Sequence, residues 1–174
     1  MSGDFQQSET EYRQALELKP DFLTAYSDLG DIYMKQQDFK KAEKMYSRAL
    51  ERGMKDPRLY SNLGILYVQL NDLDKAASFY QRAIELQKNS PEPRLGLAYV
   101  YSQLGKFNEA LAELKALLQM NPDFAMAYYQ LGAVYENLGQ KKESVNAYQR
   151  YIEMQPNDSK AIETKQLIEK LKQE

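Results

Sequence analysis

The chain has 174 residues with a formal net charge of −2, which is long enough for one compact unit with a sizeable core. It contains no cysteine and no histidine, which excludes disulfides, thiolate chemistry, cysteine metal sites and the usual acid–base group of neutral pH. There is no basic stripe, no span of bilayer length and no signal peptide at Met1-Ser2-Gly3-Asp4, so we expect no nucleic-acid partner, no membrane insertion and a cytoplasmic location.

The first expected element is a helix over residues 4–20, with apolar side chains at Phe5, Tyr12 and Leu16. Its pattern matches the second helix of a two-helix repeat whose first helix is missing, so part of its apolar face is expected to be open. Such a patch is often an interaction site, and we take these three residues as candidates for self-association. The alternatives are a capping helix that tolerates exposure, an upstream repeat outside this sequence, or a partner subunit that covers the face.

From Leu23 onward, apolar columns recur every 34 residues without an insertion. One column is all leucine: Leu29, Leu63, Leu97 and Leu131. A period held over this length is typical of a stacked repeat array. The array predicts four full repeats, here called repeats 1 to 4, over residues 23–56, 57–90, 91–124 and 125–158.

Within each repeat the apolar spacing is helical. In repeat 2, Leu63, Leu66 and Tyr67 lie on one face of one helix, and Ala76 and Tyr80 lie on one face of the next. Turn formers separate the two helices at Gln37-Asp38, Asn71-Asp72, Gly105-Lys106 and Gly139-Gln140. Each repeat is therefore expected to be a helix, a short turn and a second helix.

The last expected element is a capping helix over residues 159–174. Its apolar face is expected to hold Ala161, Ile162, Ile168 and Leu171. The opposite columns carry Lys165, Gln166 and Glu169, which make that side polar. Repeat arrays end in a polar cap of this kind, so we expect the array to end here.

These columns resemble the tetratricopeptide repeat family. The family pattern has a large aromatic residue at position 4, Leu-Gly at 7 and 8, Tyr at 11, Ala at 20, an aromatic at 24, Ala at 27 and Pro at 32. Repeat 1 matches it with Tyr26, Leu29, Gly30, Tyr33, Ala42, Tyr46 and Ala49. The resemblance implies an all-α, right-handed superhelical solenoid of helix-turn-helix repeats in one array over residues 1–174. Repeat 3 departs from the pattern and is expected to pack differently, with Arg94, Leu114 and Leu117 in place of the aromatic residues and alanine.

In this family, positions 2, 5, 6, 9, 12 and 13 of the first helices line a concave groove, so the resemblance implies a peptide-binding site there. Eleven of the fourteen tyrosines fall in the structural columns, whereas Tyr99 and Tyr129 fall on groove positions. Exposed aromatic residues are enriched at binding hot spots; the alternative is that both merely fill space between first helices. The candidate peptide-binding residues are Ser27, Asp31, Asn62, Ile65, Gln69, Leu95, Tyr99, Gln103, Met126, Tyr129, Gln130 and Asn137.

The resemblance also weighs against one known mode of binding. Family members that clamp a partner's C-terminal carboxylate use converging Lys, Asn and Arg side chains, and of these only Asn62 has a counterpart here. No nucleophile with a base, phosphate-binding loop or metal-ligand cluster is visible, so we expect no enzyme activity and no cofactor. The favoured function is an adaptor that binds a peptide segment of a partner protein. The alternatives are a self-assembling scaffold that uses the N-terminal helix, and an accessory domain of a larger enzyme or chaperone.

Overall fold

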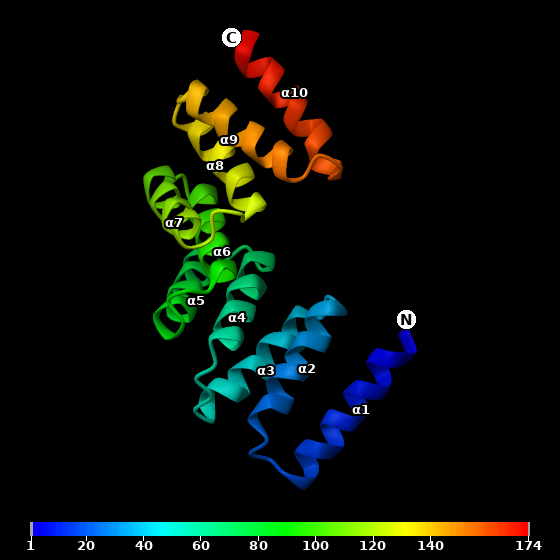
Figure 1. Cartoon of the computed structure of the whole chain (residues 1–174). Helices are drawn as coiled ribbons and strands as arrows, with labels where there is room; N and C mark the ends of the chain where they lie inside the picture. Colours follow the sequence, from blue (N-terminus) through cyan, green and yellow to red (C-terminus); the bar gives the residue numbers. More distant parts are fainter. Residues whose placement is uncertain (1, 174) are drawn as a thin grey trace. The chain divides into compact units, whose positions relative to one another are not determined.

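The structure, a computed structural model, describes residues 2–173, with side chains described from residue 6 onward. Ten α-helices and no strand are present in this part of the chain, so the expected all-α fold is confirmed. The chain divides into two compact units, residues 1–88 (unit 1) and residues 89–174 (unit 2). Unit 1 holds α1 (Ser2–Leu18), α2 (Leu23–Lys35), α3 (Phe39–Glu51), α4 (Pro57–Gln69) and α5 (Leu73–Leu86). Unit 2 holds α6 (Pro91–Gln103), α7 (Phe107–Met120), α8 (Ala125–Asn137), α9 (Lys141–Met154) and α10 (Ser159–Gln173) (Figure 1).

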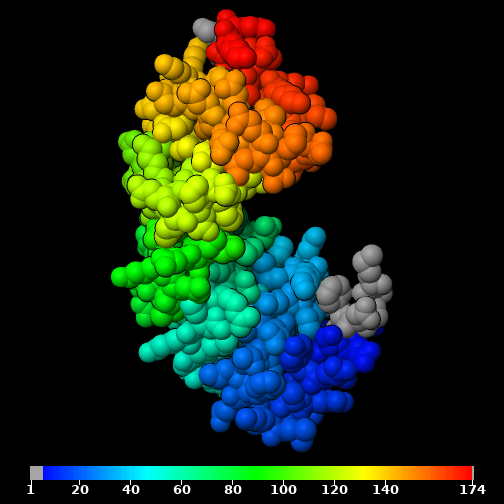
Figure 2. Space-filling view, in the orientation of Figure 1, coloured from blue at the N-terminus to red at the C-terminus, as the bar shows by residue number. Residues whose placement is uncertain are grey.

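Helices that adjoin in sequence pack together in pairs. In unit 1, α2 packs on α3 and α4 on α5; in unit 2, α6 packs on α7 and α8 on α9. The terminal helices join these pairs, because α1 packs on α2 and α10 packs on α9. Side chains close the space between the ribbons of each pair, as the space-filling view shows for α2 and α3 (Figure 2). Each repeat is thus a helical hairpin with its own buried seam.

The turn inside each hairpin ends one helix and starts the next within three residues. In repeat 1 the N–H of Asp38 donates to the carbonyl of Tyr33 at 2.9 Å, and the N–H of Gln37 donates to that of Met34 at 3.0 Å. This pattern closes a helix C-terminus and requires a left-handed residue, which here is Gln37 with φ of 60°. The Asp38 carboxylate then accepts from the N–H of Lys41 and caps α3. The same left-handed position is held by Asn71, Gly105 and Gly139.

Small residues in the first helix let a tyrosine of the second helix lie flat against it. A Cβ placed on Gly64 would lie 2.7 Å from ring atoms of Tyr80, and one on Gly132 would lie 2.5 Å from the ring of Tyr148. Real Cβ atoms do not approach this closely, so glycine is required beside each ring. The alanine columns complete the seam, because Ala42, Ala49, Ala76, Ala83 and Ala110 are fully buried.

Repeat 3 solves the same packing problem with different residues. Ala98 takes the glycine position, and the opposing tyrosine is replaced by Leu114; both side chains are fully buried. Arg94 takes the position of the aromatic residue, and its guanidinium pairs with the Glu113 carboxylate at 2.7 Å. The two charged side chains are only 17% and 25% exposed, so this ion pair fills the space that a ring fills elsewhere. The expectation that this repeat packs differently therefore has a structural cause.

The capping helix α10 differs from its prediction at one residue. Ala161, Ile168 and Leu171 are buried, but Ile162 is 66% exposed, so its assignment to the apolar face was wrong. In the full repeats, position 4 lies against the second helix of the same repeat, as Tyr60 lies against Phe79 with ring centroids 6.4 Å apart. Within the described residues no second helix packs on α10 at this position, and Ile162 is left mostly exposed.

Candidate protein-interaction surface

In unit 1 the candidate surface lies on the first helices, α2 and α4. Ile65 is 44% exposed and Gln69 is exposed, Asp31 and Asn62 are half-buried, and Ser27 is buried with 9% exposed. A hollow of about 250 Å³ opens on this face, and its lining residues are Asp31, Met34, Lys35, Tyr46, Asn62 and Ile65. A hollow with polar groups at its base and apolar walls suits a single side chain of a ligand better than a whole small molecule.

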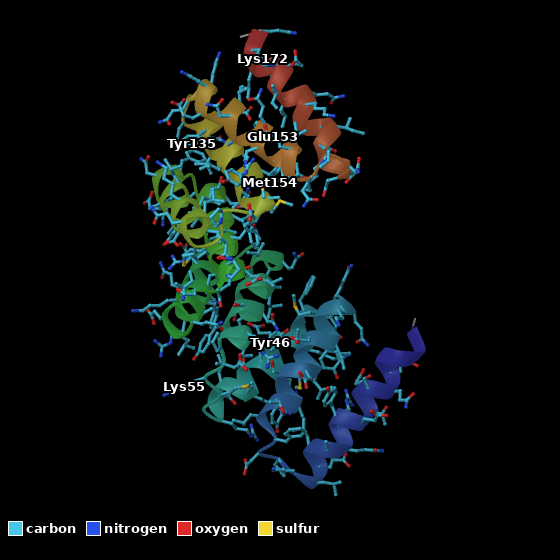
Figure 3. The ribbon with its side chains drawn as sticks, viewed as in Figure 1. Tyr46, Lys55, Tyr135, Glu153, Met154 and Lys172 are labelled. Atoms are coloured by element: carbon cyan, nitrogen blue, oxygen red, sulfur yellow. The ribbon has the colours of Figure 1, made fainter. Side chains whose placement is uncertain are left out.

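Asp31 is the centre of a hydrogen-bond network at the base of this hollow. Its Oδ1 accepts from the hydroxyl of Tyr46 at 2.6 Å and from the side-chain amide of Asn62 at 2.7 Å. Burial raises the pKa of the Asp31 carboxyl, and the hydrogen bonds from Tyr46 and Asn62 offset that rise only in part. The network links α2, α3 and α4 and fixes the orientation of all three side chains. Figure 3 labels Tyr46, which contributes the hydroxyl from α3.

Sequence reasoning missed Tyr46 as part of this surface. It was assigned to the buried column at position 24, and its ring is indeed only 1% exposed. Its hydroxyl nevertheless reaches the hollow, and burial together with the neighbouring Asp31 carboxylate raises the pKa of Tyr46. The residue type could have indicated this contact. A tyrosine rather than a phenylalanine at a buried repeat position indicates that its hydroxyl has a hydrogen-bond partner.

In unit 2, α6 carries the most exposed aromatic residue of the candidate set. Tyr99 is 41% exposed, and Gln103, one turn further along the helix, is also exposed. Leu95, one turn before Tyr99, is half-buried and packs against the core formed by α6 to α9. Tyr99 and Gln103 are therefore available to a partner, whereas most of Leu95 is used for packing.

Tyr129 on α8 contributes to packing as well as to the surface. Its ring centroid lies 5.8 Å from that of Tyr148 and 5.4 Å from that of Tyr151, which is almost completely buried. The ammonium of Lys160 lies 5.1 Å from the centroid of the Tyr129 ring. The half-buried Tyr129 thus joins α8 to α9 and to the start of α10, and only part of the ring is accessible.

The remaining candidates on α8 are amides and one methionine. Met126 and Gln130 are half-buried, and Asn137 is exposed. The Asn137 amide donates to the carbonyl of Ala133 in its own helix at 2.8 Å. This bond uses one N–H of the amide and fixes the side chain along its own helix.

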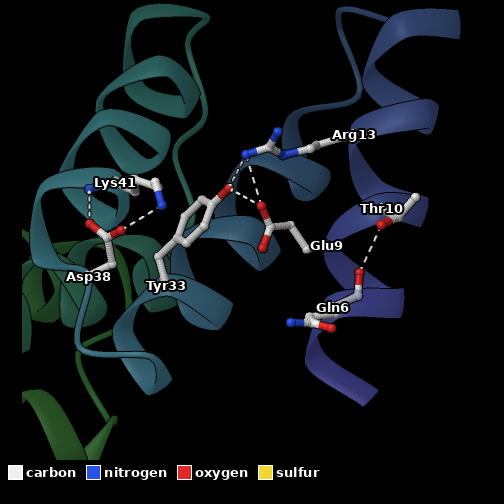
Figure 4. Close-up of polar contacts among 7 residues, drawn as sticks. All are labelled: Gln6, Glu9, Thr10, Arg13, Tyr33, Asp38 and Lys41. Atoms are coloured by element: carbon white, nitrogen blue, oxygen red, sulfur yellow. Dashed lines mark hydrogen bonds and ion pairs between the residues drawn. The ribbon is translucent and has the colours of Figure 1, made fainter. Parts of the chain in front are cut away.

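Of the residues assigned to self-association, Phe5 lies outside the part of the chain whose side chains are described. Tyr12 and Leu16 are half-buried, and a hydrogen bond with the Asp28 carboxylate raises the pKa of Tyr12. A second contact joins α1 to α2: the hydroxyl of Tyr33 donates to Glu9 and accepts from Arg13, each at 2.8 Å (Figure 4). The face of α1 that carries Tyr12 and Leu16 is therefore directed at least partly toward α2.

Neither a metal site nor a membrane span emerges from the described residues. Across residues 2–173, no group of three or more acidic, histidine or cysteine side chains is arranged to hold a metal ion. None of the ten helices in that range combines the length and the low charge needed to cross a bilayer.

Helical hairpins in sequence-adjacent pairs, with accessible side chains on the first helices, define a helical-repeat protein of the protein-interaction class. Family models described as tetratricopeptide repeat match residues 21–89, 67–118 and 125–158. A model described as TPR repeat matches residues 2–37 and 98–139. The chain belongs to the tetratricopeptide repeat family, whose members are typically non-enzymatic protein-interaction modules.

Solved structures agree with this assignment. YrrB, described as a TPR protein with an unusual peptide-binding site, is 28% identical over 95% of this chain and 85% of its own, with a TM-score of 0.82. MamA is 23% identical over 91% of this chain and 93% of its own, with a TM-score of 0.83. PilW, described as a widely conserved type IV pilus biogenesis factor, is 20% identical over 98% of this chain and 84% of its own, with a TM-score of 0.81. A comparison with curated protein sequences finds no match.

Proposed function

We propose that the protein is an adaptor that binds a peptide segment of a partner protein on the first-helix faces of its repeats. The observation that carries this proposal is Tyr99, an aromatic residue that stands 41% exposed on α6 and is not needed for any structural column. Tyrosine offers a large contact area at low entropic cost, and it is enriched where partners bind. The exposed amide of Gln103 beside it supplies both a donor and an acceptor for a peptide backbone.

The likeness to YrrB supports the same function. YrrB is described as having a peptide-binding site, and it aligns with 95% of this chain at 28% identity. Within unit 1, the hollow offers polar and apolar contact of its own, because it pairs an ordered carboxylate and amide, Asp31 and Asn62, with the exposed side chain of Ile65. An extended or helical peptide requires this combination of polar and apolar contact.

The test of the proposal begins with affinity capture on the full chain and identification of the bound protein by mass spectrometry. The interacting segment, made as a peptide, is then titrated by calorimetry, where we expect a micromolar Kd, equivalent to roughly −8 kcal/mol. Tyr99→Ala should weaken binding by about tenfold or more, because loss of a hot-spot aromatic costs at least about 1–2 kcal/mol.

The matched control is Ile162→Ala, which truncates another large exposed side chain that lies outside the candidate surface. It should leave the Kd unchanged, and circular dichroism should show native helicity for both variants. Equal affinity of the wild type and Tyr99→Ala would rule out this surface as the peptide site.

Self-association through α1 is the second candidate function. It is favoured by Leu18, which is 88% exposed at the end of the helix and follows the half-buried Leu16. Sedimentation velocity of the full chain decides between the two states: growth in mass with concentration supports association, and a monomer at every concentration rejects it.

A further inference from the structure

A second hollow in unit 1 lies on the opposite side of α2 from the candidate peptide surface. Its floor is formed by Tyr26, Leu29 and Tyr33, which lie about half a turn around the helix from Ser27 and Asp31. Its volume is about 420 Å³, and its walls come from Arg13, Leu16 and Glu17 on α1 and from Lys44, Met45 and Arg48 on α3. No part of it is used by the peptide surface proposed above.

The same place in repeat 2 is occupied by an aromatic ring of the chain itself. Phe79, at position 23 of that repeat, stacks on Tyr67 with ring centroids 5.3 Å apart and an interplanar angle of 9°. Its centroid also lies 6.4 Å from that of Tyr60. Tyr60 and Tyr67 are the repeat equivalents of Tyr26 and Tyr33, so the slot between the two tyrosines accepts a phenyl ring where one is available.

Position 23 determines whether this slot is filled in the other repeats. In repeat 3 the residue is Glu113, and its ion pair with Arg94 takes the place of the ring. In repeat 4 it is Ala147, and a hollow of about 270 Å³ opens against Tyr128, Leu131 and Tyr135. In repeat 1 it is Met45, a flexible side chain that leaves the larger hollow beside Tyr26 and Tyr33.

The rim of the repeat 1 hollow is rich in cations. Arg13, Lys44, Arg48 and Glu17 lie on its walls. Arg13 is already paired with the Glu9 carboxylate at 2.8 Å, so the positive charge offered to a partner comes from Lys44 and Arg48. Two more cations lie over the floor tyrosines: the guanidinium of Arg52 is 4.9 Å from the centroid of Tyr26, and the ammonium of Lys41 is 5.3 Å from that of Tyr33. Lys41 is paired with the Asp38 carboxylate at 2.7 Å, so Arg52 is the one that adds to the charge of the rim. An acidic segment is favoured near such a rim, and a basic one is disfavoured.

We propose that this hollow is a docking site for an aromatic side chain of a partner protein, carried in an acidic segment. The partner's ring occupies the slot between Tyr26 and Tyr33 as Phe79 occupies the slot between Tyr60 and Tyr67. Flanking carboxylates of the segment pair with Lys44 and Arg48 at the rim. Met45 shifts to admit the ring, which an unbranched thioether side chain does readily.

The test uses the full chain, with labelled leucine methyl groups, and the peptide acetyl-Asp-Phe-Asp-amide as the probe. The methyl resonances of Leu16 and Leu29, which line the hollow, should shift on titration. Acetyl-Asp-Ala-Asp-amide should bind at least tenfold more weakly because it lacks the ring. Acetyl-Asn-Phe-Asn-amide should bind at least threefold more weakly because it lacks the charges. Equal shifts with the alanine peptide would overturn the proposal.

Two matched variants place a phenyl ring at the same repeat position in different units. Met45→Phe fills the hollow from within, as Phe79 does in repeat 2, and should reduce probe binding at Leu16 and Leu29 at least tenfold. Ala147→Phe adds the same ring in repeat 4 and should leave these shifts unchanged. If the two variants respond alike, the assignment of the site is wrong.

A third variant, Arg48→Gln, keeps the proposal testable if Met45→Phe does not fold. Arg48 is exposed, so the change leaves the core intact while it removes one rim charge. It should weaken the acidic probe about threefold and leave the Asn-flanked probe unaffected. No difference between the two probes in this variant would refute the role of the rim charges.

Discussion

At the scale of single residues, the seam of each hairpin is set by a pair at positions 8 and 24. Repeat 2 pairs Gly64 with Tyr80, and repeat 3 pairs Ala98 with Leu114. In Gly64→Ala the new methyl group would meet the Tyr80 ring at 2.7 Å, and overpacking of this kind costs about 1–3 kcal/mol. In Gly64→Ala/Tyr80→Leu the pair of repeat 3 is recreated, so part of that cost should be recovered. We expect a favourable coupling of about 1–2 kcal/mol in a double-mutant cycle measured by urea unfolding.

The control for this cycle is Ala98→Gly in repeat 3. It opens space rather than closing it and should cost about 1–2 kcal/mol, from the lower helix propensity of glycine and the loss of a buried methyl group. Strictly additive effects of Gly64→Ala and Tyr80→Leu would show that the ring and the missing methyl group are not coupled.

At the scale of the elements, the turns inside the hairpins carry unequal backbone strain. Gln37 adopts φ of 60°, and a side chain in this left-handed region costs about 1–2 kcal/mol. Gln37→Gly should therefore raise the free energy of unfolding by about 0.5–1 kcal/mol, after the larger unfolded-state entropy of glycine is subtracted. Asn71→Gly should gain less, since asparagine tolerates this conformation better. Urea unfolding of the three proteins measures the differences.

The adjacent Gln36 and the equivalent Gly139 serve as controls. Gln36 has φ of −81°, so Gln36→Gly should destabilise rather than stabilise. Gly139 has φ of 71° and nothing within 4 Å of an added Cβ, so Gly139→Ala isolates the backbone strain and should cost about 1 kcal/mol. A gain in stability from Gln36→Gly as large as that from Gln37→Gly would mean that strain at φ is not the cause.

The order and type of these elements could be predicted from the sequence because the 34-residue period repeats the same local signals. Pro57, for example, opens α4 and Asn71 marks the turn after it. The exposure of individual side chains was less predictable, because it depends on contacts between helices that the repeat pattern does not specify. Ser27 is buried, Tyr129 contacts two other rings at tilted and edge-on angles, and Ile162 is 66% exposed. The regular period also gives no sign of the division into two units after residue 88.

At the scale of the whole molecule, both units contain packed tyrosines whose hydroxyls are hydrogen-bonded to carboxylates. In unit 1, Tyr46 bonds to Asp31 and Tyr67 bonds to Glu43 at 2.7 Å. In unit 2, Tyr148 bonds to Glu136 at 3.1 Å. Each such bond needs a protonated hydroxyl, since a phenolate would face a carboxylate in a buried place. The stability of each unit therefore depends on the protonation of its own buried tyrosines.

This arrangement predicts that the protein loses stability in alkali. Burial raises the pKa of Tyr67 to about 12 and raises the pKa of Tyr33, Tyr46 and Tyr148 above their ordinary value of 10. Above about pH 10 the unfolded chain releases these protons while the folded chain retains them, so the free energy of unfolding falls as the pH rises toward 12. Urea unfolding followed by circular dichroism at about pH 8 and about pH 11 measures the loss.

Tyr46→Phe separates this effect from general damage by alkali. The variant keeps the ring and removes one ionisable hydroxyl, so at about pH 8 it should lose about 1 kcal/mol with the hydrogen bond to Asp31. Between about pH 8 and about pH 11 it should then lose less stability than the wild type, because one proton fewer is linked to unfolding. A wild type that is equally stable at both pH values would contradict the prediction, since retained protons on buried tyrosines make that constancy impossible.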